Sequence, residues 1–209
     1  MGEDRADGLG VDGEGSGLGG NDADVMATIE AEGLSVFTFD GIRRITGAHP
    51  ETLSRSLERL EEDGAIVRSE EGYATTGKVR ESFGPRPVSE LGRRVSLLHT
   101  FLPNPSSTAI VVSALKGRWF DRIRWVGMSG AEEGVVMKWV TDDGGALIDA
   151  RFTSGELEVE ARIRKESDME GALRGAHQLV ARISRLYSSP RPGARPLTMH
   201  IGYFRPYAM

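Results

Sequence analysis

The strongest constraint on the fold is the segment from Thr38 to Leu60, which is typical of two short helices joined by a tight turn. The hydroxyl of Thr38 can cap the first helix, and Gly47 is the residue type that ends a helix without steric cost. Pro50 suits the first turn of the second helix, because its ring fixes φ and it has no N–H to leave unsatisfied. The second helix carries an apolar stripe of Leu53, Leu57 and Leu60. The segment therefore predicts a helix, a turn and a helix with one buried face.

The flanking segments extend this pattern into a small domain. A helix is expected over 24–33 and a short strand at Val36–Phe37, while Ile66–Arg68 and Tyr73–Thr75 are β-prone runs around a turn-forming sequence. Residues 22–76 thus resemble the winged helix-turn-helix domains of bacterial and archaeal transcription regulators. The residues that carry the resemblance are Ile42, Gly47, Pro50, the run 52–55, Leu57, Leu60, the run 61–67 and Gly72–Tyr73.

The resemblance implies that the second helix binds operator DNA. Its outer face is rich in hydroxyls and arginine, which can bind phosphates and guanine edges in the major groove. Together with arginines nearby, the predicted contacts with double-stranded DNA are Arg43, Arg44, Thr52, Ser54, Arg55, Arg59 and Arg68.

The charge of this region argues against strong non-specific DNA binding. Residues 24–80 contain seven basic and eleven acidic side chains, a net charge of −4, and phosphate contacts dominate affinity for DNA. Glu70 and Glu71 at the tip of the hairpin would repel a phosphate backbone, so we expect this wing to pack on protein or to remain in solvent. The alternative function is a winged-helix adaptor that binds protein or RNA without sequence-specific DNA recognition.

Composition narrows the remaining classes. The chain has 209 residues, 39% of them hydrophobic, and no cysteine, so disulfides and thiolate metal sites are excluded. It has no membrane-span pattern and no apolar leader, which favours a cytoplasmic protein. We expect no metal site, no cofactor and no catalytic residues. An enzyme is the weakest hypothesis, since it would need a site assembled across the second half from Asp149, Glu158 and His177.

The chain divides into five expected segments. They are a disordered acidic Gly-rich tail (1–21), the winged helix-turn-helix (22–80), a linker with an amphipathic helix (81–104), an α+β effector or dimerisation domain (105–188) and a Pro/Arg-rich tail (189–209). The helix in the third segment would begin at Ser89 and present Leu91, Val95, Leu98 and Leu102 as a stripe. This stripe can cover the following domain or pair with a second copy, and we expect a homodimer, because such regulators match a two-fold operator.

The second half is predicted to be mainly β-structure. Strands are expected over 108–115, 123–128, 134–140, 146–152 and 156–164, and a long helix over 168–187. On the last strand, the polar side chains that should face water are Glu158, Glu160, Arg162 and Arg164. The predicted fold class is α+β: an N-terminal winged helix-turn-helix followed by an antiparallel sheet covered by one long C-terminal helix.

The aromatic residues of this half leave two alternatives open. Trp119, Trp125 and Trp139, with Phe120 and Phe152, can line a pocket for a small-molecule effector, but aromatic residues on strands are more often core. The segment 116–125 interleaves basic and aromatic residues, a composition that can bind single-stranded nucleic acid. We favour an ordinary connection between strands, because aromatic residues at strand spacing usually face inward.

Overall fold

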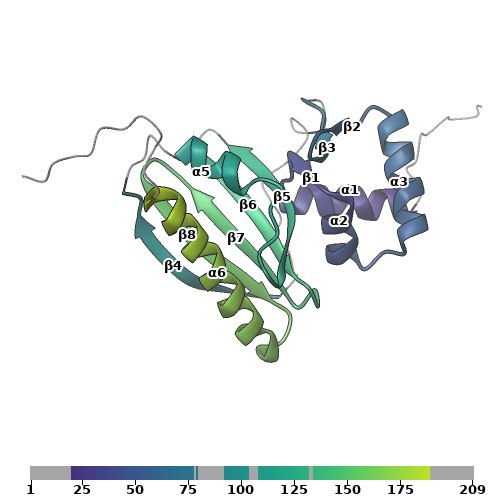
Figure 1. Cartoon of the computed structure of the whole chain (residues 1–209). Helices are drawn as coiled ribbons and strands as arrows, with labels where there is room; N and C mark the ends of the chain where they lie inside the picture. The colour runs from purple at the N-terminus through teal and green to yellow at the C-terminus, as the bar shows by residue number, and fades with distance from the viewer. Residues whose placement is uncertain (1–19, 78, 80–91, 104–107, 132–133, 189–209) are drawn as a thin grey trace, which may run out of the picture.

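The computed structural model describes residues 20–77, 79, 92–103, 108–131 and 134–188 and shows a mixed α+β protein (Figure 1). The start of the linker expected from residue 81, most of the N-terminal tail and the whole C-terminal tail lie outside these described residues. The N-terminal unit (residues 20–76) contains α1 Gly20–Glu32, β1 Val36–Phe37, α2 Phe39–Thr46, α3 Pro50–Glu62, β2 Ile66–Ser69 and β3 Gly72–Thr75. The first helix thus begins four residues before the expected position 24.

The turn between α2 and α3 forms as the sequence predicts. The Thr38 hydroxyl accepts a hydrogen bond of 3.1 Å from the backbone N–H of Gly41 and so caps α2. Gly47 follows α2 in the left-handed conformation with φ 69°, where a side chain would be strained. Pro50 occupies the first position of α3. The cap, the stop and the restart are therefore confirmed.

The C-terminal unit (residues 92–188) holds the remaining elements. They are β4 Arg93–Phe101, α5 Thr108–Leu115, β5 Ile123–Ala131, β6 Gly134–Thr141, β7 Ala146–Phe152, β8 Glu156–Ile163, a 3-10 turn Glu166–Asp168 and α6 Met169–Ser188. The four strands expected between residues 123 and 164 and the long C-terminal helix are confirmed.

The amphipathic helix expected from Ser89 to Leu102 is wrong, because residues 93–101 form the edge strand β4. This strand pairs antiparallel with β8, from Arg93 opposite Ile163 to Phe101 opposite Glu156. A register shift between Ser96 and Leu98 changes the alternation of its side chains. The apolar residues of this segment therefore have the spacing of a helical stripe, although the backbone is hydrogen-bonded to the distant strand β8. Of the expected stripe, Leu91 lies outside the described residues.

The strand expected over 108–115 is also wrong, since this run forms the short helix α5. Only Val111 and Leu115, four residues apart, are buried against the core, while Ile110 is exposed. A short continuous apolar run fits a buried strand and a helix equally well by pattern alone. Here the segment is a helix whose buried face, with Val111 and Leu115, packs against the core.

One antiparallel sheet runs through both units, in the order β2-β3-β1-β5-β6-β7-β8-β4. The two-residue strand β1 makes the connection, because Val36 pairs with Ala74 of β3 on one side and with Met128 of β5 on the other. The N-terminal unit is therefore fused to the C-terminal unit by backbone hydrogen bonds.

The shared sheet has a packed core on each face. On one face, α5 and α6 cover a core that includes Trp125, Trp139 and Ile148, and Figure 1 shows α6 lying across the strands. On the other face, Val126 and Val140 join the core of α1, α2 and α3. Helix α2 lies so close to β5 that a Cβ added at Gly41 would stand 2.6 Å from the Val126 Cα atom. A larger residue at this position would separate the two units.

Candidate nucleic-acid interface

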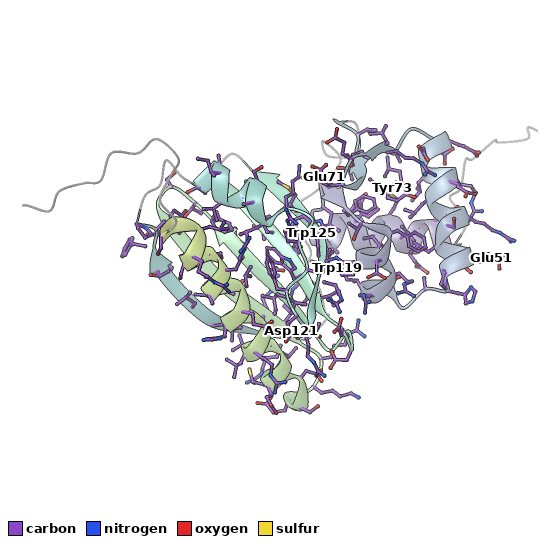
Figure 2. The ribbon with its side chains drawn as sticks, in the orientation of Figure 1. Glu51, Glu71, Tyr73, Trp119, Asp121 and Trp125 are labelled. Carbon is purple, nitrogen blue, oxygen red and sulfur yellow. The ribbon has the colours of Figure 1, made fainter. Side chains whose placement is uncertain are left out.

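Helix α3 lies at the end of the molecule away from α6 (Figure 1), with one face buried and one exposed. Leu53 and Leu57 are fully buried, and this fixes which way the other side chains project. Of the predicted DNA contacts on this helix, Arg55 and Arg59 are exposed, whereas Thr52 and Ser54 are half-buried. The outer face also carries acidic residues, namely Glu51, Glu58 and Glu62. Figure 2 shows Glu51 at this free end.

Arg55 forms the weakest kind of ion pair with its neighbour on the same helix. Its Nη2 atom lies 2.6 Å from the Glu51 carboxylate, and both side chains are 66% exposed. Exposed pairs one turn apart contribute only about 0.3–0.5 kcal/mol. Arg55 can therefore exchange this partner for another anion at little cost.

Arg59 is held much more firmly by α1. Its guanidinium donates two hydrogen bonds, of 2.7 Å and 2.6 Å, to the carboxylate of Asp22, whose side chain is only 3% exposed. The hydrogen bond to Asp22 also raises the pKa of Arg59. This arginine links α3 to α1, so its position is set by the fold of the N-terminal unit.

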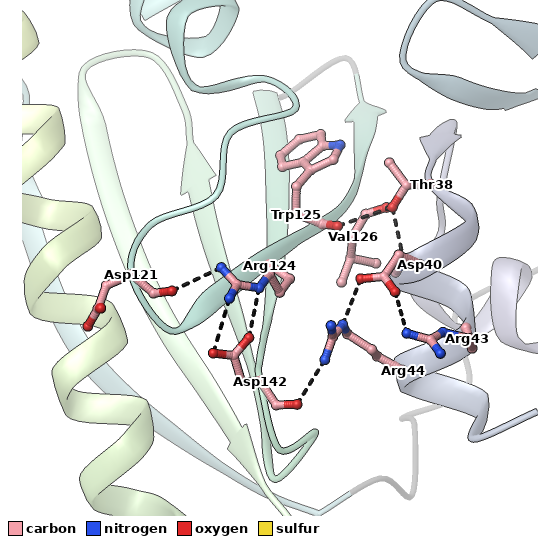
Figure 3. Close-up of polar contacts among 10 residues, drawn as sticks. Thr38, Asp40, Arg43, Arg44, Asp121, Arg124, Trp125, Val126 and Asp142 are labelled. Atoms are coloured by element: carbon pink, nitrogen blue, oxygen red, sulfur yellow. Dashed lines mark hydrogen bonds and ion pairs between the residues drawn. The ribbon is translucent and has the colours of Figure 1, made fainter.

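Arg43 and Arg44 lie on α2 and share the carboxylate of Asp40, each at 2.7 Å (Figure 3). Burial alone would raise the pKa of Asp40, but the hydrogen bonds from Arg44 and Arg43 outweigh it and lower the pKa. Arg44 also donates a hydrogen bond of 2.8 Å to the backbone carbonyl of Asp142 in the C-terminal unit. Arg44 therefore contributes to the contact between the units, while Arg43 is paired with Asp40 of its own helix, and both lie on α2 rather than on the outer face of α3.

The hairpin of β2 and β3 is attached to the C-terminal unit. Glu71 at its turn forms an ion pair of 2.7 Å with Lys116, directly after α5, which lowers the pKa of Glu71. This fits the expectation that the wing packs on protein. Arg68 of β2 pairs with Glu61 at 3.1 Å, and its guanidinium lies over the ring of Tyr73. Arg68 remains exposed and, like Arg55, has an exchangeable partner.

A cluster of buried charges joins the two units below α1. Glu32 lies between Arg162 of β8, which donates to both of its carboxylate oxygens, and Lys138 of β6, at 3.1 Å. Lys138 also contacts Asp149 of β7 at 2.9 Å. Burial raises the pKa of Glu32, but the hydrogen bond from Arg162 and the charges of Lys138 and Arg162 lower it overall. The face of β8 expected to meet water is thus covered at Arg162, and that prediction is wrong there.

Sequence reasoning missed this cluster, although one signal pointed to it. Lys138 stands inside the apolar run of β6, and a lysine in such a run needs a carboxylate partner. The partner, Glu32, is more than one hundred residues away in sequence and has no local pattern that identifies it.

A cavity of about 480 Å³ lies between α5 and the sheet. Its lining includes Val112, Met128 and Phe152, with Lys116 at one side. Only Phe152 of the suggested aromatic pocket residues takes part, because Trp125 and Trp139 are fully buried in the core. The volume lies within the range of small-molecule sites, about 300–1,000 Å³.

The residues suggested for an enzyme are not brought together. Asp149 belongs to the buried charge cluster, Glu158 pairs with Arg151 on the next strand, and His177 lies on α6, which covers the opposite face of the sheet. Within the described residues, no group of three potential ligands could hold a metal ion.

None of the described helices has the length and apolar character of a membrane span.

No protein-family model, curated protein or solved structure matches the chain significantly.

Proposed function

We propose that residues 20–76 form a winged helix-turn-helix domain and that the protein is a DNA-binding transcription regulator acting in the cytoplasm. The observation that supports this best is the position of α3. It projects at the free end of the molecule, while its buried face is fixed by the shared core. A recognition helix needs both properties, since it must enter the major groove and hold its side chains in register.

The geometry divides the seven proposed contacts into two groups. Arg55 pairs with the exposed Glu51, and Arg68, itself exposed, pairs with the half-buried Glu61. Releasing Arg55 costs less than the discrimination of about 1–3 kcal/mol that a bidentate guanine contact provides. Thr52 and Ser54 lie beside Arg55 on α3 and can serve phosphates or base edges. Arg44 and Arg59 bond to elements other than their own helix and act in DNA binding chiefly by positioning, whereas Arg43 pairs with Asp40 of its own helix.

The effector and the dimer are parts of the same proposal. A small molecule in the cavity beside α5 would lie next to Lys116, which holds the hairpin through Glu71, so it could change the position of the wing. A homodimer would fit a two-fold operator. Its interface cannot be the expected helical stripe, because Leu98 is on the strand β4.

The test begins with selection and sequencing of genomic fragments that bind the purified protein at moderate salt. Arg55→Ala should then lower affinity for the recovered site about tenfold to a hundredfold, the loss expected for one base contact. Arg174→Ala is the matched control, because Arg174 forms an equivalent exposed pair with Glu170 at 2.6 Å on α6. The control should bind as wild type does. Unchanged binding by Arg55→Ala would show that α3 does not read DNA.

A second candidate is a protein-binding adaptor, and the acidic outer face of α3 favours it. Glu51, Glu58 and Glu62 project there, and both exposed arginines of the helix are already paired with carboxylates. Such a surface suits a basic protein partner better than a phosphate backbone. A folded protein that recovers no DNA motif would put this candidate first.

A further inference from the structure

A second cavity, of about 690 Å³, lies between α6 and the loop that connects α5 to β5. It is distinct from α3 and from the cavity beside α5. Its lining includes Arg118, Trp119 and Asp121 from the loop and Gln178 and Arg182 from α6. The loop belongs to the basic and aromatic segment 116–125, which the proposed function does not use.

The cavity is rich in positive charge, because Arg118, Arg182 and Arg185 all line it. Among the described residues, Arg118 and Arg182 form no ion pair, in contrast to the paired arginines of α2 and α3. The carboxylate of Asp121, which also lines the cavity, accepts a hydrogen bond of 2.8 Å from Gln178. Two guanidinium groups facing one cavity without a carboxylate partner favour an anionic ligand with several oxygens, such as phosphate.

Trp119 supplies a flat aromatic surface at the same place. It is 59% exposed, whereas the other two tryptophans are fully buried. Figure 2 labels it between Trp125 and Asp121. The Arg124 guanidinium lies 4.9 Å from the centre of the Trp119 ring and is itself held by Asp142 at 2.7 Å. The expectation that the aromatic residues of this segment face inward therefore holds for Trp125 and fails for Trp119.

The loop that carries these groups has a fixed shape. The indole N–H of Trp139 donates a hydrogen bond of 2.9 Å to the Arg118 carbonyl. The backbones of Phe120 and Ile123 bond to each other twice, at 3.0 Å and 2.8 Å. Because the loop is already ordered, a ligand would lose little affinity to ordering it.

We infer that this cavity binds a nucleotide, with an aromatic base stacked on Trp119 and a phosphate held by Arg118 and Arg182. The combination of an exposed indole and unpaired guanidinium groups suits a ligand with a planar ring and a phosphate. The volume also fits a nucleotide-sized ligand. The nucleotide can be free or part of a single strand, since both present the same base and phosphate.

The test is titration of the full-length protein, followed by tryptophan fluorescence and calorimetry. The probes are AMP, GMP, CMP and UMP, a hexamer of deoxythymidylate, adenosine, and inorganic phosphate. We expect quenching by a nucleotide or by the hexamer, and affinity at least tenfold weaker for adenosine or phosphate alone, because each makes only part of the contacts. Binding of free nucleotides alone would identify the small ligand, and stronger binding of the hexamer would identify a single strand.

Two variants separate this site from the rest of the surface. Arg118→Ala with Arg182→Ala should weaken binding at least tenfold, and Trp119→Ala should weaken it and remove the quenching. Arg94→Ala on β4 is the control, since Arg94 is also exposed and lies away from the cavity. The inference is wrong if no probe binds the folded protein, or if the double variant binds as tightly as Arg94→Ala. Neither result bears on α3, whose test uses Arg55→Ala and duplex DNA.

Discussion

Replacing Glu32 by glutamine should destabilise the whole protein by about 3–5 kcal/mol, because it breaks a buried ion pair from one side. The Glu32 carboxylate accepts a hydrogen bond of 2.7 Å from Arg162 Nη1 and a second from Nη2, and Lys138 lies 3.1 Å away. Glutamine keeps the shape but not the charge. The substitution leaves two buried cations, Lys138 and Arg162, with Asp149 as their remaining carboxylate partner in the cluster. The loss is a large part of a typical domain stability of about 5–15 kcal/mol.

Urea unfolding followed by tryptophan fluorescence measures this loss. Trp125 and Trp139 are fully buried and report on the core beneath α6. Because both units share one sheet, the wild-type protein should unfold in a single transition, and Glu32→Gln should shift its midpoint with little change in slope. The control is Glu158→Gln, which breaks the more exposed pair of Glu158 with Arg151 at 3.6 Å. It should change stability by less than about 0.5 kcal/mol.

A second substitution tests whether charge balance is the cause. Combining Glu32→Gln with Lys138→Met removes one charge of each sign and leaves Arg162 opposite Asp149. The double variant should therefore be at least about 0.5–1 kcal/mol more stable than the sum of the two single effects predicts. Additive effects would mean that the two charges do not interact.

The pH dependence gives an independent measurement of the same carboxylate. The pKa of Glu32 is lower in the folded protein than in the unfolded chain, because the hydrogen bond from Arg162 and the two cations outweigh the effect of burial. The stabilisation is therefore fully present above the unfolded value of about 4.3 and is lost as pH falls through the lower folded value. Wild type should lose stability in acid more steeply than Glu32→Gln. Equal pH profiles, or a variant as stable as Glu158→Gln, would refute the buried cluster.

Two further predictions concern helix packing. On α6, Gly175→Ala should lower the free energy of unfolding by about 1–3 kcal/mol, because the new Cβ would lie 2.6 Å from Ile123 and 2.7 Å from Ile148. The control Gly171→Ala, whose Cβ would have its nearest atom at 3.9 Å, should raise it by about 0.5–1 kcal/mol. Equal shifts in thermal midpoint for the two variants would contradict this packing. Arg59→Ala should lower unfolding free energy by about 1–3 kcal/mol, because it removes both hydrogen bonds to the buried Asp22 carboxylate. Arg55→Ala is its control and should be nearly neutral in the same urea experiment.

The sequence predicts those parts of the fold in which local chemistry decides the structure. The hydroxyl of Thr38, the left-handed Gly47 and the ring of Pro50 act within a few residues, so the boundaries of α2 and α3 follow from them. Strand β8 alternates in burial over most of its length, and β6 is a continuous run of mainly buried residues. Both patterns are local to the strand, so the sequence predicts these strands as well.

Elements that depend on distant partners could not be predicted. Strand β4 is stabilised by pairing with β8, about sixty residues later, and α5 by burial of only two side chains. The pairing of β1 with β5 joins segments ninety residues apart through a strand of two residues. Such a short strand has no periodicity of its own, so the fusion of the two units had no signal in the sequence.

The same limit applies to the candidate sites. Sequence spacing places Arg55 and Arg59 on one face of α3, and the structure agrees, but spacing cannot show that Asp22 binds Arg59. Likewise, the segment 116–125 shows its basic and aromatic character in the sequence. Only the structure shows that Arg182 of α6 lines the same cavity as Arg118. Residue type identifies candidate binding residues, and tertiary contacts decide which of these side chains are already paired within the protein.

The fusion of the two units bears on how ligand binding in the C-terminal unit would affect α3. Arg124 donates to the Asp121 carbonyl and pairs with Asp142, whose own carbonyl accepts from Arg44 on α2 (Figure 3). The Thr38 hydroxyl, which caps α2, also donates to the Trp125 carbonyl at 3.1 Å. The loop between α5 and β5, which carries Trp119, is thus connected to α2 through Arg124 of β5 and Asp142. In a flexibly linked pair of domains a ligand would leave α3 unaffected, whereas here any shift of the start of β5 must be accommodated by α2, which adjoins α3.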